Sequence, residues 1–337
     1  MSEIVSREIR LKSRPVGAPG LDAFELATAA ITGPGAGEVL VRNAWMSVDP
    51  YMRFQMMEQQ HYPTWEIGKV LNGGALGRVI ESNTPEFKAG DYVESSYGWR
   101  EYFVAPPGAL SKIDPALAPL RSYLGAVGMP GLSAYVGLLR TAGLKQGERV
   151  FVSGAAGAVG SVACQIAKAM DCEVVATAGS DEKCDWLKEA AKVDHAINYK
   201  TCGKLKAAVR AAMPKGINVF FDNVGGDCLV AGIANMADFG RIAICGTISQ
   251  YNNTSRAVGP HNLNLVVPKR IRLEGFEIAD HWDARPEFLA DMGRWIRAGK
   301  MQCLETVHEG LEHAPQAFID LFDGGNLGKM LVQIGPE

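Results

Sequence analysis

The sequence predicts a two-domain α/β protein in which an all-β barrel precedes a doubly wound parallel sheet with helices on both faces. The length indicates two domains, because the chain has 337 residues and single hydrophobic cores stop growing at roughly 250–300 residues. A change of pattern near Gly147 indicates two kinds of domain. Short strand-like runs dominate before it, and strands alternating with helical periods follow it.

The part up to about residue 125 has the pattern of an all-β unit. Its strand-like runs are separated by clusters of Gly and Pro, which favour turns. These runs are residues 38–43, 77–81 and 91–93. They predict a small barrel.

The second part alternates strands with helical periods. The strand-like runs are residues 150–152, 173–176, 219–221 and 241–244. Such βαβ alternation predicts a parallel sheet whose two faces are both covered by helices.

The domain boundaries follow from these patterns. We expect the first domain to cover residues 1–125 and the second to cover 126–304, connected through residues 115–121 and a bridging helix that begins near Met129. After Gly299 the sequence again has strand-like runs, on either side of a helical run near 315–322. The tail, residues 305–337, is therefore expected to complete the first domain.

Composition and charge favour a small-molecule partner. The chain is 47% hydrophobic and 21% charged, with a formal net charge of −3, so it has no basic excess for nucleic acid or anionic lipid. Its first dozen residues carry charges throughout, which excludes a signal peptide or membrane helix there. Seven cysteines form no CxxC pair, and an odd number fits reduced thiols in the cytoplasm.

The strongest local motif is a glycine turn between a strand and a helix. The strand 150–152 runs into Ser-Gly-Ala-Ala-Gly-Ala-Val-Gly, and a helical run follows at 161–170. Gly157 and Gly160 fill the second and third glycine places of the dinucleotide-binding fingerprint, while Ala155 stands in the first. Such glycines permit a tight turn and close approach of the pyrophosphate to a helix N-terminus. We expect a dinucleotide here.

The next strand end indicates NADPH rather than NADH. NAD enzymes usually place an acidic residue there for the ribose 2′-hydroxyl, but this strand is followed by Gly179 and Ser180. Lys183 supplies a cation for a 2′-phosphate, and Asp181 is expected to cap the helix. A charge-assisted contact of this kind corresponds to about ten- to hundredfold preference for NADPH.

Six motifs carry a family resemblance over essentially the whole chain. They are residues 47–53 (SVDPYMR), 128–135 (GMPGLSAY), 155–161 (AAGAVGS), 221–226 (FDNVGG), 245–252 (CGTISQYN) and 326–329 (NLGK). Together they resemble the zinc-free prostaglandin reductase and leukotriene hydroxydehydrogenase family of medium-chain dehydrogenases/reductases, which includes 2-alkenal and curcumin reductases.

The resemblance implies a GroES-like catalytic barrel and a Rossmann domain that binds NADPH. It also implies a homodimer joined through an edge strand near residues 272–278. The implied cofactor contacts are Gly157, Ala158, Val159 and Gly160 at the pyrophosphate, Gly179, Ser180, Lys183 and Tyr199 around the 2′-phosphate, and, along the rest of the cofactor, Asn223, Cys245, Gly246, Thr247, Ile248, Ser249, Tyr251, Phe276, Glu277, Ile278 and Asn326.

The ligands of a catalytic zinc are absent from the sequence. No cysteine precedes Cys164, and residues 72–78, where zinc-dependent relatives carry Gly-His-Glu, read NGGALGR. The six histidines are scattered. Without a metal to polarise an alcohol, the expected reaction is reduction of the C=C bond of small hydrophobic enones or enals, with negative charge developing on the carbonyl oxygen as an enolate.

Two tyrosines are candidate catalytic residues. A phenol can donate a hydrogen bond to an enolate without ionising, and the resemblance places the motif of Tyr51 toward the cleft, with Tyr251 as a second candidate. Aromatic and sulfur-bearing side chains of the first domain are expected to line an adaptable apolar pocket. They are Trp45, Met46, Met52, Met56, Met57, His61, Tyr62, Trp65, Tyr97 and Trp99.

Three other functions remain open at this point. A quinone reductase of the same superfamily would also use NADPH without a metal. An NADP-dependent dehydrogenase of allylic or hydroxy-lipid alcohols would oxidise an alcohol to a carbonyl compound and would not reduce a C=C bond. A non-catalytic nucleotide sensor or scaffold would have the same fold but no enzymatic activity.

Overall fold

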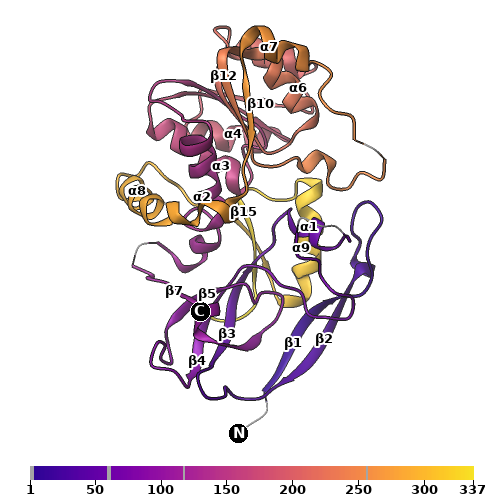
Figure 1. Cartoon of the computed structure of the whole chain (residues 1–337), viewed down its shortest axis with the longest axis vertical. Helices are drawn as coiled ribbons and strands as arrows, with labels where there is room; N and C mark the ends of the chain where they lie inside the picture. Colours follow the sequence, from indigo (N-terminus) through magenta and orange to yellow (C-terminus); the bar gives the residue numbers. More distant parts are fainter. Residues whose placement is uncertain (1–3, 59–61, 117, 256) are drawn as a thin grey trace. The chain divides into compact units, whose positions relative to one another are not determined.

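The computed structural model describes residues 4–58, 62–116, 118–255 and 257–337, and the chain divides into two compact units (Figure 1). Each unit takes residues from more than one stretch of the chain. The first consists of Met1–Leu124, Glu305–Asn326 and Met330–Glu337, and the second of Gly125–Leu304 and Leu327–Lys329.

The first unit is built on a seven-stranded sheet. The strand order is β14-β15-β3-β4-β5-β7, and β6 also pairs with β3. The strands are β3 (Val39–Ser47), β4 (Ala75–Ser82), β5 (Tyr92–Ser95), β6 (Tyr102–Ala105), β7 (Ser111–Lys112), β14 (Glu305–Glu309) and β15 (Lys329–Gln333). A separate antiparallel pair is formed by β1 (Ile4–Leu11) and β2 (Phe24–Ile31). The predicted all-β first part is confirmed.

The centre of this sheet is β3, whose residues are nearly all buried. Antiparallel neighbours lie on both sides of it, since β4, β6 and β15 all pair with it. A strand covered on both faces carries a nearly continuous apolar run rather than a strict alternation. The tail strand β15 therefore belongs to the same sheet as strands from the first third of the chain.

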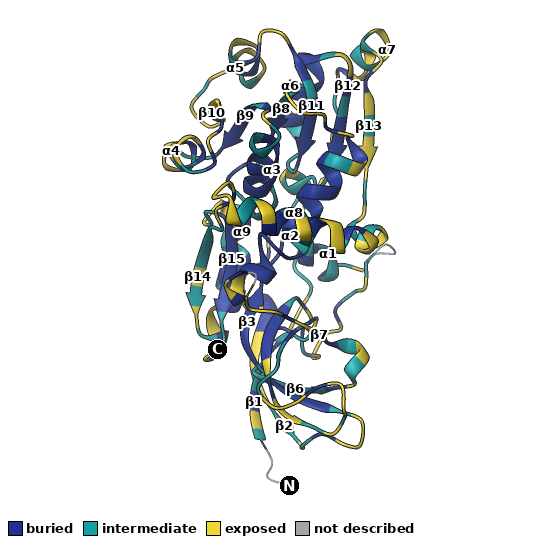
Figure 2. Ribbon diagram, turned by 90° about the vertical axis from the view of Figure 1, so that its left-hand side faces the viewer, coloured by how far each residue is buried: buried dark blue, intermediate teal, exposed yellow. Residues whose placement is uncertain are grey.

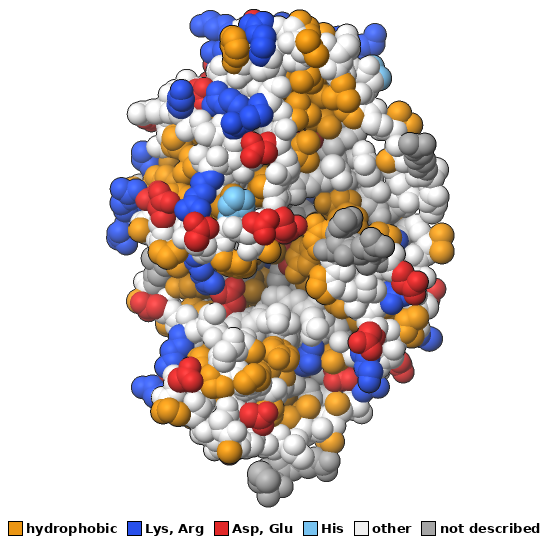
Figure 3. Space-filling model, in the orientation of Figure 1, with side chains coloured by type: hydrophobic (Ala, Val, Ile, Leu, Met, Phe, Trp, Pro, Cys, Tyr) orange, Lys and Arg blue, Asp and Glu red, His pale blue; other side chains and the backbone are white. Residues whose placement is uncertain are grey.

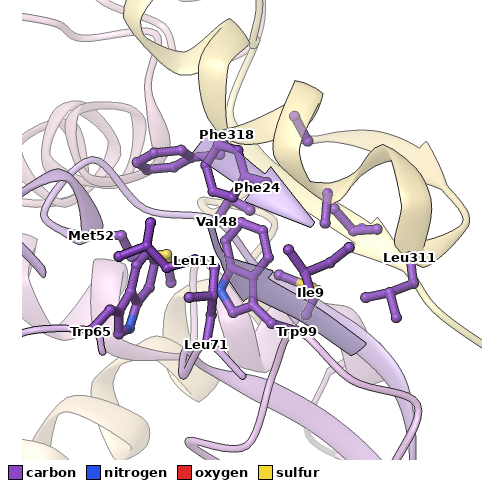
Figure 4. Packing of buried hydrophobic residues seen from close by; sticks show 14 of the residues in the cluster. Ile9, Leu11, Phe24, Val48, Met52, Trp65, Leu71, Trp99, Leu311 and Phe318 are labelled. Carbon is purple, nitrogen blue, oxygen red and sulfur yellow. The ribbon is translucent and has the colours of Figure 1, made fainter. Parts of the chain in front are cut away.

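A hydrophobic core of this unit gathers around Trp99 (Figure 4). The Trp99 ring stacks on Phe24 with centroids 6.0 Å apart and meets Trp65 and Phe318 edge-on at 5.8 and 6.3 Å. Phe318 comes from α9 (Ala314–Asp323), so the tail also contributes to this core. Paired aromatic rings in these geometries add stabilisation beyond the apolar area that they bury.

The expected apolar pocket is wrong for five of its residues, because they belong to this core and are almost inaccessible to solvent. They are Met46, Met52, Met56, Trp65 and Trp99. Trp45 is also buried, and its indole nitrogen donates to a Glu337 carboxylate oxygen at 2.8 Å. Tyr97 stacks on Phe103 at 4.6 Å and Tyr62 on Phe54 at 5.3 Å. Met57 is half-buried, and His61 lies outside the described residues.

The second unit contains a six-stranded parallel sheet in the order β10-β9-β8-β11-β12-β13. Its strands are β8 (Arg149–Val152), β9 (Glu173–Ala178), β10 (His195–Asn198), β11 (Ile217–Asp222), β12 (Met236–Ile244) and β13 (Arg272–Gly275). All five neighbouring pairs are parallel. The central strands are buried (Figure 2), which confirms the predicted doubly wound sheet.

Helices α3 to α7 connect these strands, as the alternating pattern predicted, while α2 precedes β8 and α8 follows β13. The helices of this unit are α2 (Met129–Tyr135), α3 (Ala158–Ala169), α4 (Asp181–Glu189), α5 (Leu205–Ala212), α6 (Gly226–Asn235), α7 (Val266–Lys269) and α8 (Arg285–Arg297). From β8 the chain moves outward through β9 to β10, and it then returns to β11 on the other side of β8. This reversal makes the carboxyl ends of β8 and β11 the switch point at which open α/β sheets bind ligands.

Three features of the structure concern possible binding partners: surface charge, membrane-spanning helices and the exposed edge of the parallel sheet. Acidic and basic side chains are interspersed over the face drawn in Figure 3, in keeping with the net charge of −3. No helix among the described residues is long and apolar enough to cross a membrane. The predicted edge strand corresponds to β13, which ends the sheet and is largely exposed.

Candidate functional site

The glycine turn between β8 and α3 has the geometry of an anion site. Gly157 is the N-cap of α3, and no side chain caps this 12-residue helix. The amide of Ala155 donates to the Thr177 carbonyl of β9 at 2.9 Å, which fixes the turn against the sheet. The first-turn amides of α3 are therefore not taken by a capping side chain, and such amides bind phosphate.

Gly160 lets α3 start close to this turn. A Cβ built on Gly160 would collide with the carbonyl oxygen of Gly154 and lie 2.7 Å from the Cα of Ala155. Both obstacles are backbone atoms, so no side-chain rotation would relieve the overlap. The third glycine of the motif is required for packing of the helix on the turn, as the sequence predicted.

A segment from the tail lies on the same turn. The amide of Gly328 donates to the Ala156 carbonyl at 2.8 Å, and Gly328 forms an isolated bridge with Gly157. The amide of Lys329 donates to the Leu304 carbonyl at 2.8 Å. Residues 327–329 therefore contact the glycine turn, and the strand–turn–helix motif alone does not predict this contact.

Gly328→Ala is expected to destabilise the protein by about 2–5 kcal/mol, because φ is +73° and a Cβ would collide with the Leu304 carbonyl. The matched control is Gly299→Ala, since Gly299 has φ +68° and nothing within 4 Å of a Cβ. This control measures only the cost of holding an alanine in the left-handed backbone conformation, about 1–2 kcal/mol. Urea unfolding of both variants measures the difference, and equal losses would contradict the packing argument.

The end of β9 carries no carboxylate, and its turn leads into α4. Ser180 is the N-cap of α4 and its hydroxyl accepts from the Lys183 amide at 3.3 Å. The expected cap, Asp181, is wrong by one residue. Asp181 is the first helical residue, and its carboxylate accepts from the Asn198 side chain at 2.8 Å instead. Ser180 alone has the extended backbone that a cap requires.

Lys183 and Tyr199 lie at this strand end. Lys183 is half-buried, and burial together with the nearby charge of Lys200 holds its pKa below the ordinary value. A Cβ on Gly179 would lie 2.9 Å from the Tyr199 hydroxyl, so the phenol reaches across this glycine. The arrangement brings a cation and a hydroxyl to the place predicted for the 2′-phosphate.

Asp222, at the end of β11, organises the next loop, and the sequence reasoning missed this role. Its fully buried carboxylate accepts from the Ser153 hydroxyl at 2.6 Å and from the amides of Val224 and Gly225 at 3.0 and 3.1 Å. Burial raises the pKa of Asp222 despite these hydrogen bonds. The sequence did contain a signal for this role, because an acidic residue at the end of a buried strand needs several hydrogen-bond donors around its carboxylate.

Asn223 ties the two central strands together. Its side-chain amide donates to the Ser153 carbonyl at 2.8 Å, and its backbone amide donates to the Ser153 hydroxyl at 2.9 Å. These bonds fix Asn223 at the switch point between β8 and β11.

The stretch after β12 lies beside the β11 loop. Cys245 donates its amide to the Asp222 carbonyl at 2.8 Å, and the Ser249 hydroxyl donates to the Val224 carbonyl at 2.6 Å. Burial raises the pKa of Cys245 to about 12, so this thiol stays protonated and is a poor nucleophile. The Tyr251 hydroxyl accepts from the Thr247 amide at 3.3 Å, and burial raises its pKa.

The remaining predicted contacts of this unit follow β13. Phe276 meets the Phe221 ring with centroids 6.4 Å apart, and a Cβ on Gly137 would lie 2.8 Å from the Phe276 ring. Phe276 is half-buried, Glu277 is exposed and Ile278 begins a 3₁₀ helix. Predicted contacts therefore follow all six strands at their carboxyl ends, the edge where parallel sheets bind ligands.

Comparison with known proteins decides the family. A model described as N-terminal domain of oxidoreductase matches residues 7–113, and one described as zinc-binding dehydrogenase matches residues 158–293. The NADP(+)-dependent 2-alkenal reductase of Nicotiana tabacum is 41% identical over 99% of both chains. Prostaglandin reductase 1 of Mus musculus is 43% identical over 96% of this chain and 97% of its own. This chain belongs to the prostaglandin reductase and 2-alkenal reductase family of oxidoreductases.

A solved structure and a further sequence relative agree with membership of this reductase family. CurA of Vibrio vulnificus, determined with NADPH, superposes with a TM-score of 0.93 at 37% identity, covering 98% of this chain and 100% of CurA. The NADPH-dependent curcumin reductase of Escherichia coli (strain K12) is 40% identical over 97% of this chain and 96% of its own. The GroES-like and Rossmann domains predicted from the motifs are thereby confirmed.

The first unit of this reductase holds the other two predicted site residues. Tyr51 is the N-cap of the short helix α1 (Met52–Gln55) and packs, partly buried, against the core around Trp99. Before it, the Ser47 hydroxyl donates to the buried Asp49 carboxylate, which fixes the turn from β3 into α1. Asn326 ends the segment Glu305–Asn326 of this unit, directly before Leu327 of the second unit.

One family description names zinc, and residues 158–293, which it matches, contain six of the seven cysteines. Among residues 4–58, 62–116, 118–255 and 257–337, no three His, Cys, Asp or Glu side chains are placed to hold a metal ion together. Each of the seven cysteines is free of disulfides.

Proposed function

We propose that this protein is an NADPH-dependent reductase of the C=C bond of small α,β-unsaturated ketones and aldehydes. The observation that supports this proposal most is sequence identity of 40–43%, over nearly the whole chain, to 2-alkenal, prostaglandin and curcumin reductases. The end of β9 supports the phosphorylated nucleotide, because Gly179 and Ser180 replace the usual acidic residue and Lys183 adds a cation.

In this proposal, the residues that follow each strand of the parallel sheet bind different parts of NADPH. The amides at Gly157–Gly160 hold the pyrophosphate, and Lys183 and Tyr199 hold the 2′-phosphate. Asn223, the stretch 245–251, residues 276–278 and Asn326 position the nicotinamide half. NADPH, when bound, supplies a hydride to the β-carbon of the substrate.

The protein must then stabilise the enolate that remains. We assign this to the Tyr51 phenol, which donates a hydrogen bond to the carbonyl oxygen as negative charge develops there. A proton added at the α-carbon completes a two-electron reduction to the saturated ketone or aldehyde. Tyr251 is the second candidate, and its raised pKa favours a neutral phenol that keeps a proton to donate.

Three further properties belong to the proposal. The reaction proceeds without zinc, since the sequence has no cysteine before Cys164. The protein is a homodimer that pairs through the exposed edge strand β13. It works in the cytoplasm, where seven thiols without a disulfide are expected.

The deciding experiment follows NADPH consumption with matched substrates. We expect rapid oxidation of NADPH with an alkyl enone or enal, and a saturated carbonyl compound as the product. Slow turnover is expected with a simple quinone, and with an allylic alcohol plus NADP⁺. Faster reduction of the quinone than of the enone would reject the proposal in favour of a quinone reductase.

Prolonged dialysis against a zinc chelator is expected to leave enone reduction unchanged. Hydride transfer to an alkene needs no Lewis acid at the carbonyl when a phenol donates to the enolate. Rates before and after dialysis, with metal content measured by mass spectrometry, check this. Loss of activity that returns on adding Zn²⁺ would show that a metal participates.

A further inference from the structure

We propose that Lys200 is a second cationic contact for the 2′-phosphate of NADPH, so that Lys183 and Lys200 together select the phosphorylated cofactor. This inference rests on the proposed function and adds a specificity-determining residue to it. Lys200 lies outside the glycine motif and the strand end from which the cofactor preference was predicted.

The pairing of β9 with β10 brings Lys200 to the site. The two strands are parallel, and Ala178 at the end of β9 is in register with Asn198 at the end of β10. The residues that follow each strand are therefore neighbours. A Cβ on Gly179 would lie 3.4 Å from the Cε of Lys200, so the lysine side chain passes directly over this glycine.

Asn198 fixes the backbone of Lys200 against the start of α4. Its side-chain oxygen accepts from the Lys200 amide at 3.0 Å, and its side-chain nitrogen donates to the Asp181 carboxylate at 2.8 Å. One side chain thus joins the end of β10 to the helix that carries Lys183. This connection orders the base of the Lys200 side chain before any ligand arrives.

The charges around this strand end favour an added anion. The positive charge of Lys200 contributes, after burial, to the lowered pKa of Lys183, so the two cations are close enough to repel. Within the described residues, Lys200 has no carboxylate within 4 Å, and Asp181 is already bonded to Asn198. Glu182 opposes the effect on Lys183 only as a smaller contribution.

A 2′-phosphate placed between the two lysines would relieve this repulsion. The phosphate carries close to two negative charges at neutral pH, and each ammonium group can give it a charge-assisted hydrogen bond. NADH offers only a hydroxyl at this position, so it gains nothing from Lys200. The lysine should therefore affect phosphorylated nucleotides selectively.

The test measures binding rather than turnover, using calorimetric titration with NADPH, NADH and 2′,5′-ADP. Lys200→Gln is expected to weaken NADPH and 2′,5′-ADP about five- to fiftyfold. NADH affinity should stay within about twofold, since it makes no contact through this charge. Lys200→Arg, which keeps the charge, should recover most of the lost affinity.

Lys192→Gln is the matched control, because Lys192 is exposed and precedes β10 at its opposite end. Binding of 2′,5′-ADP by Lys200→Gln equal to that of the control would overturn the proposal, and so would equal losses for NADPH and NADH. The proposed reaction fails separately, if the wild-type protein binds 2′,5′-ADP but reduces no enone.

Discussion

Replacing Gly160 with alanine is expected to weaken NADPH binding about ten- to hundredfold, at a cost of about 1–3 kcal/mol in stability. A Cβ at this position collides with the Gly154 carbonyl and crowds the Cα of Ala155. Because neither obstacle can rotate away, the N-terminus of α3 must move off the turn. The amides at the pyrophosphate would then lose their alignment, and a fluorescence titration with NADPH measures the result.

The control for this variant is Gly232→Ala in α6, where a Cβ would crowd the Phe220 ring with similar severity. Gly232 packs a helix on β11 within the core and not at the carboxyl edge of the sheet. We expect a comparable loss of thermal stability but NADPH affinity within about threefold of wild type. If both variants lost affinity equally, general destabilisation would explain the effect and the glycine turn would not.

Replacing Tyr51 with phenylalanine is expected to lower kcat for enone reduction about a hundred- to a thousandfold. The substitution removes one oxygen and keeps the ring that packs against the core around Trp99, so the fold should be retained. Since Tyr51 acts on charge that develops only in the transition state, kcat and kcat/KM should fall together. Steady-state rates with one enone, with a thermal melt alongside, measure this.

Tyr251→Phe separates the two catalytic candidates. The Tyr251 hydroxyl accepts the Thr247 amide, so its loss should disturb the loop beside the cofactor and weaken NADPH binding more than it lowers kcat. An unchanged kcat in Tyr51→Phe would remove Tyr51 from the role of enolate donor. A hundredfold fall in Tyr251→Phe with normal NADPH affinity would transfer that role to Tyr251.

Local patterns in the sequence were sufficient for much of this molecule. The strand, glycine turn and helix of residues 150–170 appear as β8 and α3, since apolar runs and glycines act over short distances. The relatives confirm the predicted family, fold class, reaction class and cofactor. Strand β1 was missed, because buried Ser6 and Glu8 interrupt its apolar alternation.

What the sequence could not provide depends on contacts between distant residues. Lys200 approaches Gly179 only because β10 pairs with β9, and no local sequence pattern predicts that these two strands are neighbours in the sheet. The same holds for Gly328, whose place on the turn requires the tail to return. The apolar pocket was predicted wrongly for residues such as Trp99 and Met52, because the presence of large side chains does not tell whether they face a core or a cleft.

The short insertion of residues 327–329 into the second unit has a consequence for how the protein is made. No continuous stretch of the chain contains the whole nucleotide-binding unit, which lacks its last piece when residue 304 has been synthesised and gains it 25 residues later. During translation, the hydrogen bond from the Gly328 amide to the Ala156 carbonyl can therefore form only after the tail has been made. A fragment of residues 125–304 would lack Gly328 and its hydrogen bond to the glycine turn, whereas the same fragment with residues 327–329 joined to it by a linker would contain the missing piece.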